Sequence, residues 1–342
     1  MVLGSPSDSS ILAGDIGGTK INLGLFKPQG SRLSTIAEAT LHSKDYSSLD
    51  QALDHFFEGK NVSVSSAAFG VASPIVNGRA DAPNLHWRLA TDELRDKLKI
   101  PHVALINDLE ATALGISILP EQSFAVLNEG KAVPHGDWAV IAAGTGLGEA
   151  ALVWERSRYR VIPSEGGHSD FAPRNALEIA LLQYLLGKFD RVSYERVLSG
   201  PGLHNIYMFL REYRPIPEPA WLTEELLKED PSAVITEMGL ADRDAVCREA
   251  LDIFVSIYGA EAGNLALTFF ATGGIYIGGG IAPKILPKLK ERAFLKAFTD
   301  KGRLATLLSS LPVRVILDPR AALFGAAYHA LSLLPVDVAV ES

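Results

Sequence analysis

Cysteine is nearly absent from this sequence: Cys247 is the only one in 342 residues. A single thiol excludes a disulfide within the chain and also the zinc sites that require several cysteines. Residues 1–10 contain glycine, serine and proline but no hydrophobic segment of the kind found in signal peptides. We therefore expect a cytoplasmic protein in which residues 1–10 form a disordered leader.

Long apolar runs and long basic runs are also missing. No segment approaches the roughly 20 apolar residues that a membrane-spanning helix needs. Lysine and arginine number 32 against 40 aspartates and glutamates, which gives a formal net charge of −8. An acidic chain without a basic stripe is poorly suited to nucleic acid or to anionic membranes. We expect neither as a partner.

Two common nucleotide-binding motifs are absent as well. No glycine-lysine pair stands in the spacing of a P-loop, and no G-x-G-x-x-G opens a helix. What is present is a large apolar fraction, 47% of the residues, in a chain long enough for about two domains. Strand-like and helical segments alternate, which predicts an α/β fold with strands at 11–14, 21–26, 64–71 and 103–106 and helices at 49–57 and 109–118.

A glycine-rich turn between two apolar strands opens the folded part of the chain. Its residues are Gly14, Asp15, Ile16, Gly17, Gly18 and Thr19. Glycines let backbone N–H groups approach an anion closely, and the threonine hydroxyl adds a donor. Asp15 can hold the water shell of a cation. The turn therefore predicts a phosphate site, with an ordinary hairpin turn as the alternative.

The same pattern returns about 130 residues later, where Gly144, Thr145 and Gly146 lie between the apolar segments 138–143 and 150–154. Such a long-range duplication predicts two similar halves that face each other across a cleft, with a nucleotide between the two turns. A third glycine-rich strand end follows the segment 275–277. There Gly279 and Gly280 are candidates for a further nucleotide contact, or simply for a tight turn.

A carboxylate follows the buried-looking strand 103–106, since Asn107 and Asp108 come directly after it. Ligands of open α/β sheets bind beyond the carboxyl ends of strands, which makes Asp108 a candidate functional residue. Aspartate is also an excellent N-cap, and the next segment is helical. Both interpretations stay open at this point.

Further polar groups occur in glycine-containing loops. Glu165 and His168 stand three residues apart around two glycines, Glu195 lies in a short helical turn, and Asn84 lies in a turn before Trp87. Carboxylate and imidazole side by side suit the adjacent hydroxyls of a sugar. Metal ligation, for which no second cluster supplies the remaining ligands, and plain loop residues are the alternatives.

Six motifs in order carry a family resemblance: GDIGGT at 14–19, INDLEA at 106–111, AGTGLG at 143–148, EGGHSDFAP at 165–173, ERVLSGPGL at 195–203 and GGGIAP at 278–283. With them the chain resembles the bacterial-type glucokinases of the hexokinase, actin-like ATPase superfamily. The resemblance runs from Gly14 to about Gly325.

The resemblance implies an α/β fold of two ribonuclease H-like (actin-like ATPase) domains flanking a cleft. The smaller domain is expected to comprise residues 11–118 and 319–342, including a returning C-terminal helix, and the larger one residues 119–318. The resemblance also implies a cytoplasmic homodimer.

The implied activity is ATP-dependent phosphorylation of D-glucose at its 6-hydroxyl, the first step of glycolysis. Position by position, Asp108 resembles the general base, and Asn84, Asn107, Glu165, His168 and Glu195 resemble the other sugar contacts. The glycine turns, including Gly279 and Gly280, resemble the ATP site, and Asp15 is implied to position Mg²⁺ through water. A kinase for another hexose, such as mannose or fructose, and a non-catalytic sugar sensor on the same fold remain alternatives.

Overall fold

The computed structural model describes residues 10–29, 32–82 and 85–334. The predicted sugar contact Asn84 and residues 1–9 of the predicted leader lie outside the described residues. Ser10 does not belong to a leader, because its backbone N–H donates to the Ser63 carbonyl at 3.0 Å and it begins the first strand. The chain forms two compact units, unit 1 with residues 1–121, 159–161 and 318–342, and unit 2 with residues 122–158 and 162–317.

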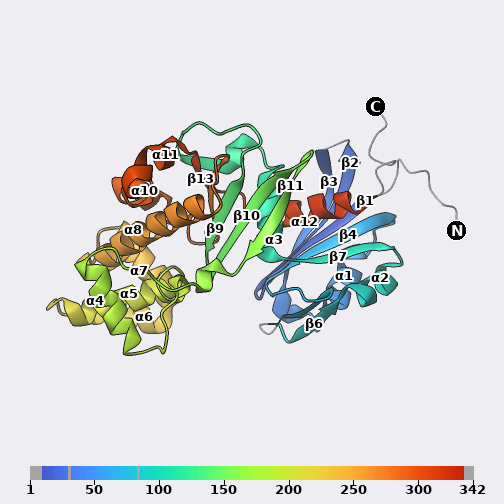
Figure 1. Ribbon diagram of the computed structural model, residues 1–342. Helices are drawn as coiled ribbons and strands as arrows, with labels where there is room; N and C mark the ends of the chain where they lie inside the picture. The colour runs from blue at the N-terminus through green and yellow to red at the C-terminus, as the bar shows by residue number, and fades with distance from the viewer. Residues whose placement is uncertain (1–9, 30–31, 83–84, 335–342) are drawn as a thin grey trace. The chain divides into compact units, whose positions relative to one another are not determined.

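Unit 1 is an α/β layer structure (Figure 1). Its elements are β1 (Ser10–Ile16), β2 (Lys20–Gln29), β3 (Arg32–His42), α1 (Leu49–Phe57), β4 (Val64–Val71), β5 (Arg79–Ala82), β6 (Trp87–Ala90), α2 (Thr91–Leu98), β7 (His102–Asn107), α3 (Asp108–Ile116) and α12 (Ala321–Ser332). Five strands form a sheet in the order β3-β2-β1-β4-β7, and β5 pairs with β6. Strand β1 is antiparallel to β2 and parallel to β4, which is parallel to β7.

Both faces of this sheet are covered at its central strands β1 and β4, which explains why these two strands are mostly buried. Successive side chains of a strand point to opposite faces. Accordingly Leu12 packs in a cluster with Phe56 of α1, whereas Ile11 packs in a second cluster with Leu323 of α12. The C-terminal helix α12 thus belongs to the same core as the first strand of the chain, as Figure 1 shows.

Helices α3 and α12 approach each other at glycines. A Cβ built at Gly325 would lie 1.7 Å from the Ala111 carbonyl oxygen, and one built at Gly115 would lie 2.1 Å from the Ala321 carbonyl oxygen. Only glycine allows backbones to come this close. The contact fixes α3, whose first residue is Asp108.

Unit 2 is the larger one. Its elements are β8 (Phe124–Asn128), β9 (Trp138–Ala143), β10 (Leu147–Glu155), β11 (Arg158–Ser164), α4 (Ala176–Leu186), α5 (Gly200–Tyr213), α6 (Ala220–Lys228), α7 (Pro231–Leu240), α8 (Ala245–Thr268), β12 (Gly274–Gly278), α9 (Leu286–Leu289), α10 (Arg292–Thr299), α11 (Ala305–Ser310) and β13 (Val313–Ile316). The sheet order is β11-β10-β9-β12-β13-β8. Helix α8 is buried along most of its length and begins after the N-cap Asp244.

The two sheets repeat one topology. In each, a central strand is antiparallel to the strand that follows it through a glycine-rich turn and parallel to its neighbour on the other side. The order β3-β2-β1-β4-β7 corresponds to β11-β10-β9-β12-β13, with β8 added at the edge. The predicted α/β class and the predicted duplication of two similar halves are confirmed.

None of the helices within the described residues combines the length and the apolar character needed to cross a membrane.

Candidate functional site

The first glycine turn joins β1 to β2, and two hydrogen bonds of Gly17 stabilise it. Gly17 donates its backbone N–H to the Lys20 carbonyl at 2.9 Å, and the Ser43 hydroxyl donates to the Gly17 carbonyl at 2.9 Å. Gly18 and Thr19 are exposed at the tip of the turn. Gly14 has a different role, because it is buried against the Phe69 ring, 2.5 Å from the position of a Cβ. The part of the turn that remains open to a ligand is therefore Gly18 and Thr19.

Two carboxylates of unit 1 lie near the ends of β1 and β7. Burial raises the pKa of Asp15 to about 6, a hydrogen bond from Asn22 acts in the opposite direction, and the charge of Asp108 raises the pKa further. The Asn22 amide donates to Asp15 Oδ2 at 3.0 Å. The two aspartates therefore interact electrostatically, and a positive charge placed beside them would be favourable.

The interpretation of Asp108 as an N-cap is wrong, because Asn107 occupies that position. Asn107 Oδ1 accepts the Leu109 N–H at 2.9 Å, and the Asn107 amide donates to the Ser73 carbonyl at 3.3 Å. Asp108 is the first residue of α3, and its Oδ1 accepts the same Leu109 N–H at 2.8 Å. The Asn107 side chain thus caps the helix and also binds another segment. The Asp108 carboxylate still has lone pairs that can accept hydrogen bonds from a ligand.

A cluster of polar side chains is formed in unit 2 by Glu165, His168 and Glu195. His168 Nε2 lies 3.9 Å from Glu165 Oε2, and His168 Nδ1 lies 3.9 Å from Glu195 Oε1. The side chains of Glu165 and His168 are 77% and 53% exposed. Glu195 Oε2 accepts the Leu147 N–H at 3.0 Å, which ties the cluster to the start of β10. Oxygen and nitrogen atoms of this kind can bind several hydroxyls of one small ligand.

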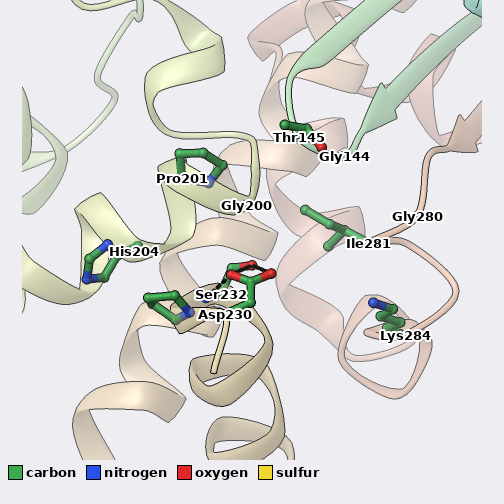
Figure 2. A pocket seen from close by; sticks show the side chains of 11 residues that line it. Gly144, Thr145, Gly200, Pro201, His204, Asp230, Ser232, Gly280, Ile281 and Lys284 are labelled. Atoms are coloured by element: carbon green, nitrogen blue, oxygen red, sulfur yellow. Dashed lines mark hydrogen bonds between the residues drawn. The ribbon is translucent and has the colours of Figure 1, made fainter. Parts of the chain in front are cut away.

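A pocket of 590 Å³ opens where the second glycine turn meets two helix N-termini (Figure 2). Its lining includes Gly144 and Thr145 from the turn after β9, and Gly280 from the turn after β12. Helices α5 and α7 begin at the pocket, and Gly200 of α5 donates its N–H to the Gly144 carbonyl at 2.8 Å. Helix N-termini carry partial positive charge and favour anions such as phosphate.

Eight further residues line this pocket, and none of them was predicted from the sequence as a site residue. They are Gly200, Pro201, His204, Asp230, Pro231, Ser232, Ile281 and Lys284. Figure 2 shows Ser232 beside Asp230, whose carboxylate accepts the Ser232 hydroxyl at 2.9 Å. One signal was available: an aspartate followed by proline is typical of a helix start, and Asp230 is the N-cap of α7.

Two predicted nucleotide glycines shape the turns without lining the pocket. Gly279 has a φ of +82°, and a Cβ there would lie 2.1 Å from the Ala143 carbonyl oxygen. A Cβ at Gly146 would lie 2.5 Å from Glu195 Oε2. Of the seven predicted glycines, all of them in the described part of the chain, Gly279 alone has a left-handed φ.

The predicted site residues are divided between the two units. Asp15, Asn107 and Asp108 belong to unit 1, whereas Glu165, His168, Glu195 and the pocket belong to unit 2. No group of three or more histidine, cysteine or acidic side chains suited to a metal ion occurs among the described residues.

Comparison with known proteins gives one family. The glucokinase family model matches residues 12–333. A glucokinase of Nostoc punctiforme is 45% identical over 338 residues, which cover 94% of this chain and 99% of the relative. A glucokinase of Synechocystis is 40% identical over 343 residues, covering 93% and 97%.

Solved structures agree with this match. A glucokinase from an Antarctic psychrotroph has a TM-score of 0.84 at 29% identity, with 95% of this chain and 99% of that chain covered. A glucokinase of the ROK family from Streptomyces griseus, in complex with glucose and AMPPNP, has a TM-score of 0.63 at 21% identity, covering 95% and 100%. The likeness to these kinases confirms the predicted actin-like ATPase fold.

Proposed function

This chain belongs to the glucokinase family, and on that premise we propose that it transfers the terminal phosphoryl group of ATP to the 6-hydroxyl of D-glucose, the first step of glycolysis. The near full-length match at up to 45% identity carries the proposal. The glycine-lined pocket and the polar cluster of unit 2 support it, because they suit a nucleotide and a polyhydroxy ligand respectively.

Asp108 is proposed as the general base. Phosphoryl transfer has a loose transition state, so a base accepts the hydroxyl proton late and needs no raised pKa. The first position of α3 holds the carboxylate at a defined place, since Asn107 caps the helix and Gly115 and Gly325 fix it against α12. Asn107 and Asn84 are proposed as sugar-binding neighbours.

Asp15 is proposed to position Mg²⁺ through water. The residue suits the ion, because a buried carboxylate whose pKa is raised to about 6 gains from a nearby cation. Mg²⁺ binds oxygen atoms, keeps several waters and commonly touches one or two carboxylates plus substrate phosphates. Bound Mg²⁺ neutralises charge on the phosphates. Asp15 itself then orients the water shell of the ion.

The nucleotide is proposed to bind the glycine turn and the pocket of unit 2, and the glycine turn of unit 1 is proposed as a phosphate site. Backbone N–H groups of the turns and the exposed Thr19 and Thr145 hydroxyls are donors for phosphate oxygens, and the α5 N-terminus adds partial positive charge. Gly280 leaves room for a flat group, because nothing lies within 4 Å of a Cβ built there.

A coupled assay of glucose 6-phosphate formation with ATP and Mg²⁺ tests the function, run beside mannose, fructose, N-acetylglucosamine and a polyphosphate donor. Strong turnover confined to glucose and ATP supports the proposal. Preference for another hexose would show that the chain is a kinase for that hexose instead. Glucose binding without turnover would favour the alternative of a non-catalytic sugar sensor.

Glu165→Gln is expected to raise the glucose KM at least about tenfold with kcat within about threefold, because it removes a charge-assisted hydrogen bond to the sugar. The ATP KM should not change. Glu224→Gln, at a 69% exposed position of α6, is the matched control and should retain the wild-type glucose KM. An unchanged glucose KM in Glu165→Gln would remove this residue from the sugar site.

The family resemblance also supports a cytoplasmic homodimer. Light scattering after size exclusion would give the mass in solution.

A further inference from the structure

A buried pair of carboxyl groups lies beneath the loop that carries Glu165 and His168. Glu149 of β10 is 3% exposed and Glu261 of α8 is 5% exposed. A Cβ built at Gly166 would lie 2.1 Å from Glu149 Oε2. At Gly166 the loop therefore rests directly on a carboxyl group.

The start of β10 contacts the remaining parts of the polar cluster as well. A Cβ at Gly167 would lie 2.1 Å from the Leu147 carbonyl oxygen, and the Leu147 N–H donates to Glu195 Oε2 at 3.0 Å. Only Gly148 separates Leu147 from Glu149. A displacement of the Glu149 side chain would thus reach the loop 165–168 directly, whereas the pocket of unit 2 has no lining residue from β10.

The two carboxyl groups differ in the hydrogen bonds that they make. Glu261 Oε2 accepts a hydrogen bond from the Asn264 amide at 2.8 Å. The Asn264 amide also donates to the Tyr194 hydroxyl, and Lys301 Nζ donates to Asn264 Oδ1. Glu149 Oε1 has no hydrogen-bond partner among the described residues. Two adjacent buried carboxyls hold one proton between them, and the proton stays on the less well solvated one. Burial, followed by the charge and the hydrogen bond of Glu261, raises the pKa of Glu149 to about 8.

We propose that Glu149 is a positioning residue for the sugar-binding loop 165–168: its protonated carboxyl packs under Gly166 beside Glu261, and loss of the proton displaces the loop and weakens sugar binding. The inference rests on the proposed function, because it gives that loop its role in binding glucose. Repulsion between two buried carboxylates is relieved only when one of them moves toward water.

Other titratable groups lie near the pair. They are Tyr258 of α8, Tyr194 beside Glu195, Lys301 and Arg174 near Glu261 and Tyr194, and the exposed Glu165 and His168 of the loop. Burial raises the pKa of Tyr194 and lowers that of Lys301. Lys301 is therefore a second possible source of an alkaline pH response.

The variant Glu149→Gln distinguishes a pH response of Glu149 from one of Lys301, because glutamine has nearly the same shape as glutamic acid and stays neutral at every pH. Glucose affinity is measured by titration calorimetry. If the sugar binds only the protonated form, wild-type affinity falls about tenfold between about pH 7 and about pH 9. The Glu149→Gln affinity is expected to stay constant over this range, with kcat and the ATP KM close to wild type at neutral pH.

Glu224→Gln should reproduce the wild-type profile. A pH-independent wild-type affinity, or a Glu149→Gln protein with the wild-type pH dependence, overturns the inference, and the latter would assign the response to another group such as Lys301. Absence of glucose binding at every pH contradicts the proposed function itself. These two failures are distinguishable in one titration series.

Thermal unfolding tests the protonation state without any substrate. Folded Glu149 keeps its proton up to about pH 8, whereas the unfolded chain loses it near 4.5. Through Glu149 the folded state binds more protons in this window, so the contribution of Glu149 to the free energy of unfolding falls as pH rises from about 4.5 to about 8. The Tm of Glu149→Gln relative to wild type should rise across the same window. A constant Tm difference would contradict a protonated Glu149.

Discussion

Asp108→Ala is expected to lower kcat by at least about 10²-fold while glucose binding stays measurable, since a positioned general base typically contributes that much. Asp108 begins α3, and its carboxylate shares the Leu109 N–H with the Asn107 cap. The cap remains in the variant, so the helix should persist. The loss should therefore appear in kcat rather than in the fold.

Steady-state kinetics and glucose calorimetry on the same preparation check this prediction. Asp54→Asn is the matched control, because Asp54 is a 68% exposed aspartate of the same unit whose ion pair with Lys97 lies at the surface. It should keep wild-type kcat. A kcat of Asp108→Ala within about fivefold of wild type would refute the assignment of the base.

Gly279→Ala is expected to destabilise the protein by about 2–5 kcal/mol, the sum of a left-handed backbone cost and overpacking. The residue has a φ of +82°, and its new Cβ would lie 2.1 Å from the Ala143 carbonyl oxygen. Ala143 ends β9 and leads into the Gly144 turn. One methyl group thus disturbs two glycine turns that are proposed to bind the nucleotide, and the ATP KM should rise at least about tenfold.

Guanidinium unfolding and ATP kinetics measure the two effects. Gly280→Ala is the control for stability alone, because nothing lies within 4 Å of its Cβ and its φ is not left-handed. It should unfold within about 1 kcal/mol of wild type. Equal stability of the two alanine variants would show that the turn tolerates a side chain at Gly279.

Local signals in the sequence predicted several elements well. Helix α1 and strand β4 have the predicted bounds, 49–57 and 64–71. The Ser48 side chain caps α1 by accepting the Gln51 N–H, as cap chemistry next to an apolar repeat implies. Pro283 does not begin a helix, since residues 281–285 form turns and α9 begins at Leu286. Proline is compatible with a turn as well as with a helix start.

The sequence did not predict which residues from distant parts of the chain come together. His204, Asp230 and Lys284 meet at one pocket although about 80 residues separate the first from the last. Glu149 carried no signal, because an acidic residue in a strand normally points to water. Its burial near Glu261 depends on the packing of α8 against the sheet of unit 2, which no local pattern encodes.

The sequence by itself determined the α/β class, the duplicated glycine turns and the choice of Asp108, Glu165, His168 and Glu195 as candidates, because periodicity, cap chemistry and motif spacing act over a few residues. Tertiary structure alone decided that Asn107 rather than Asp108 caps α3, which residues line the pocket, and that Glu149 and Glu261 are buried. Those outcomes depend on groups brought together from separate elements, and desolvation and mutual repulsion arise only when the chain is folded.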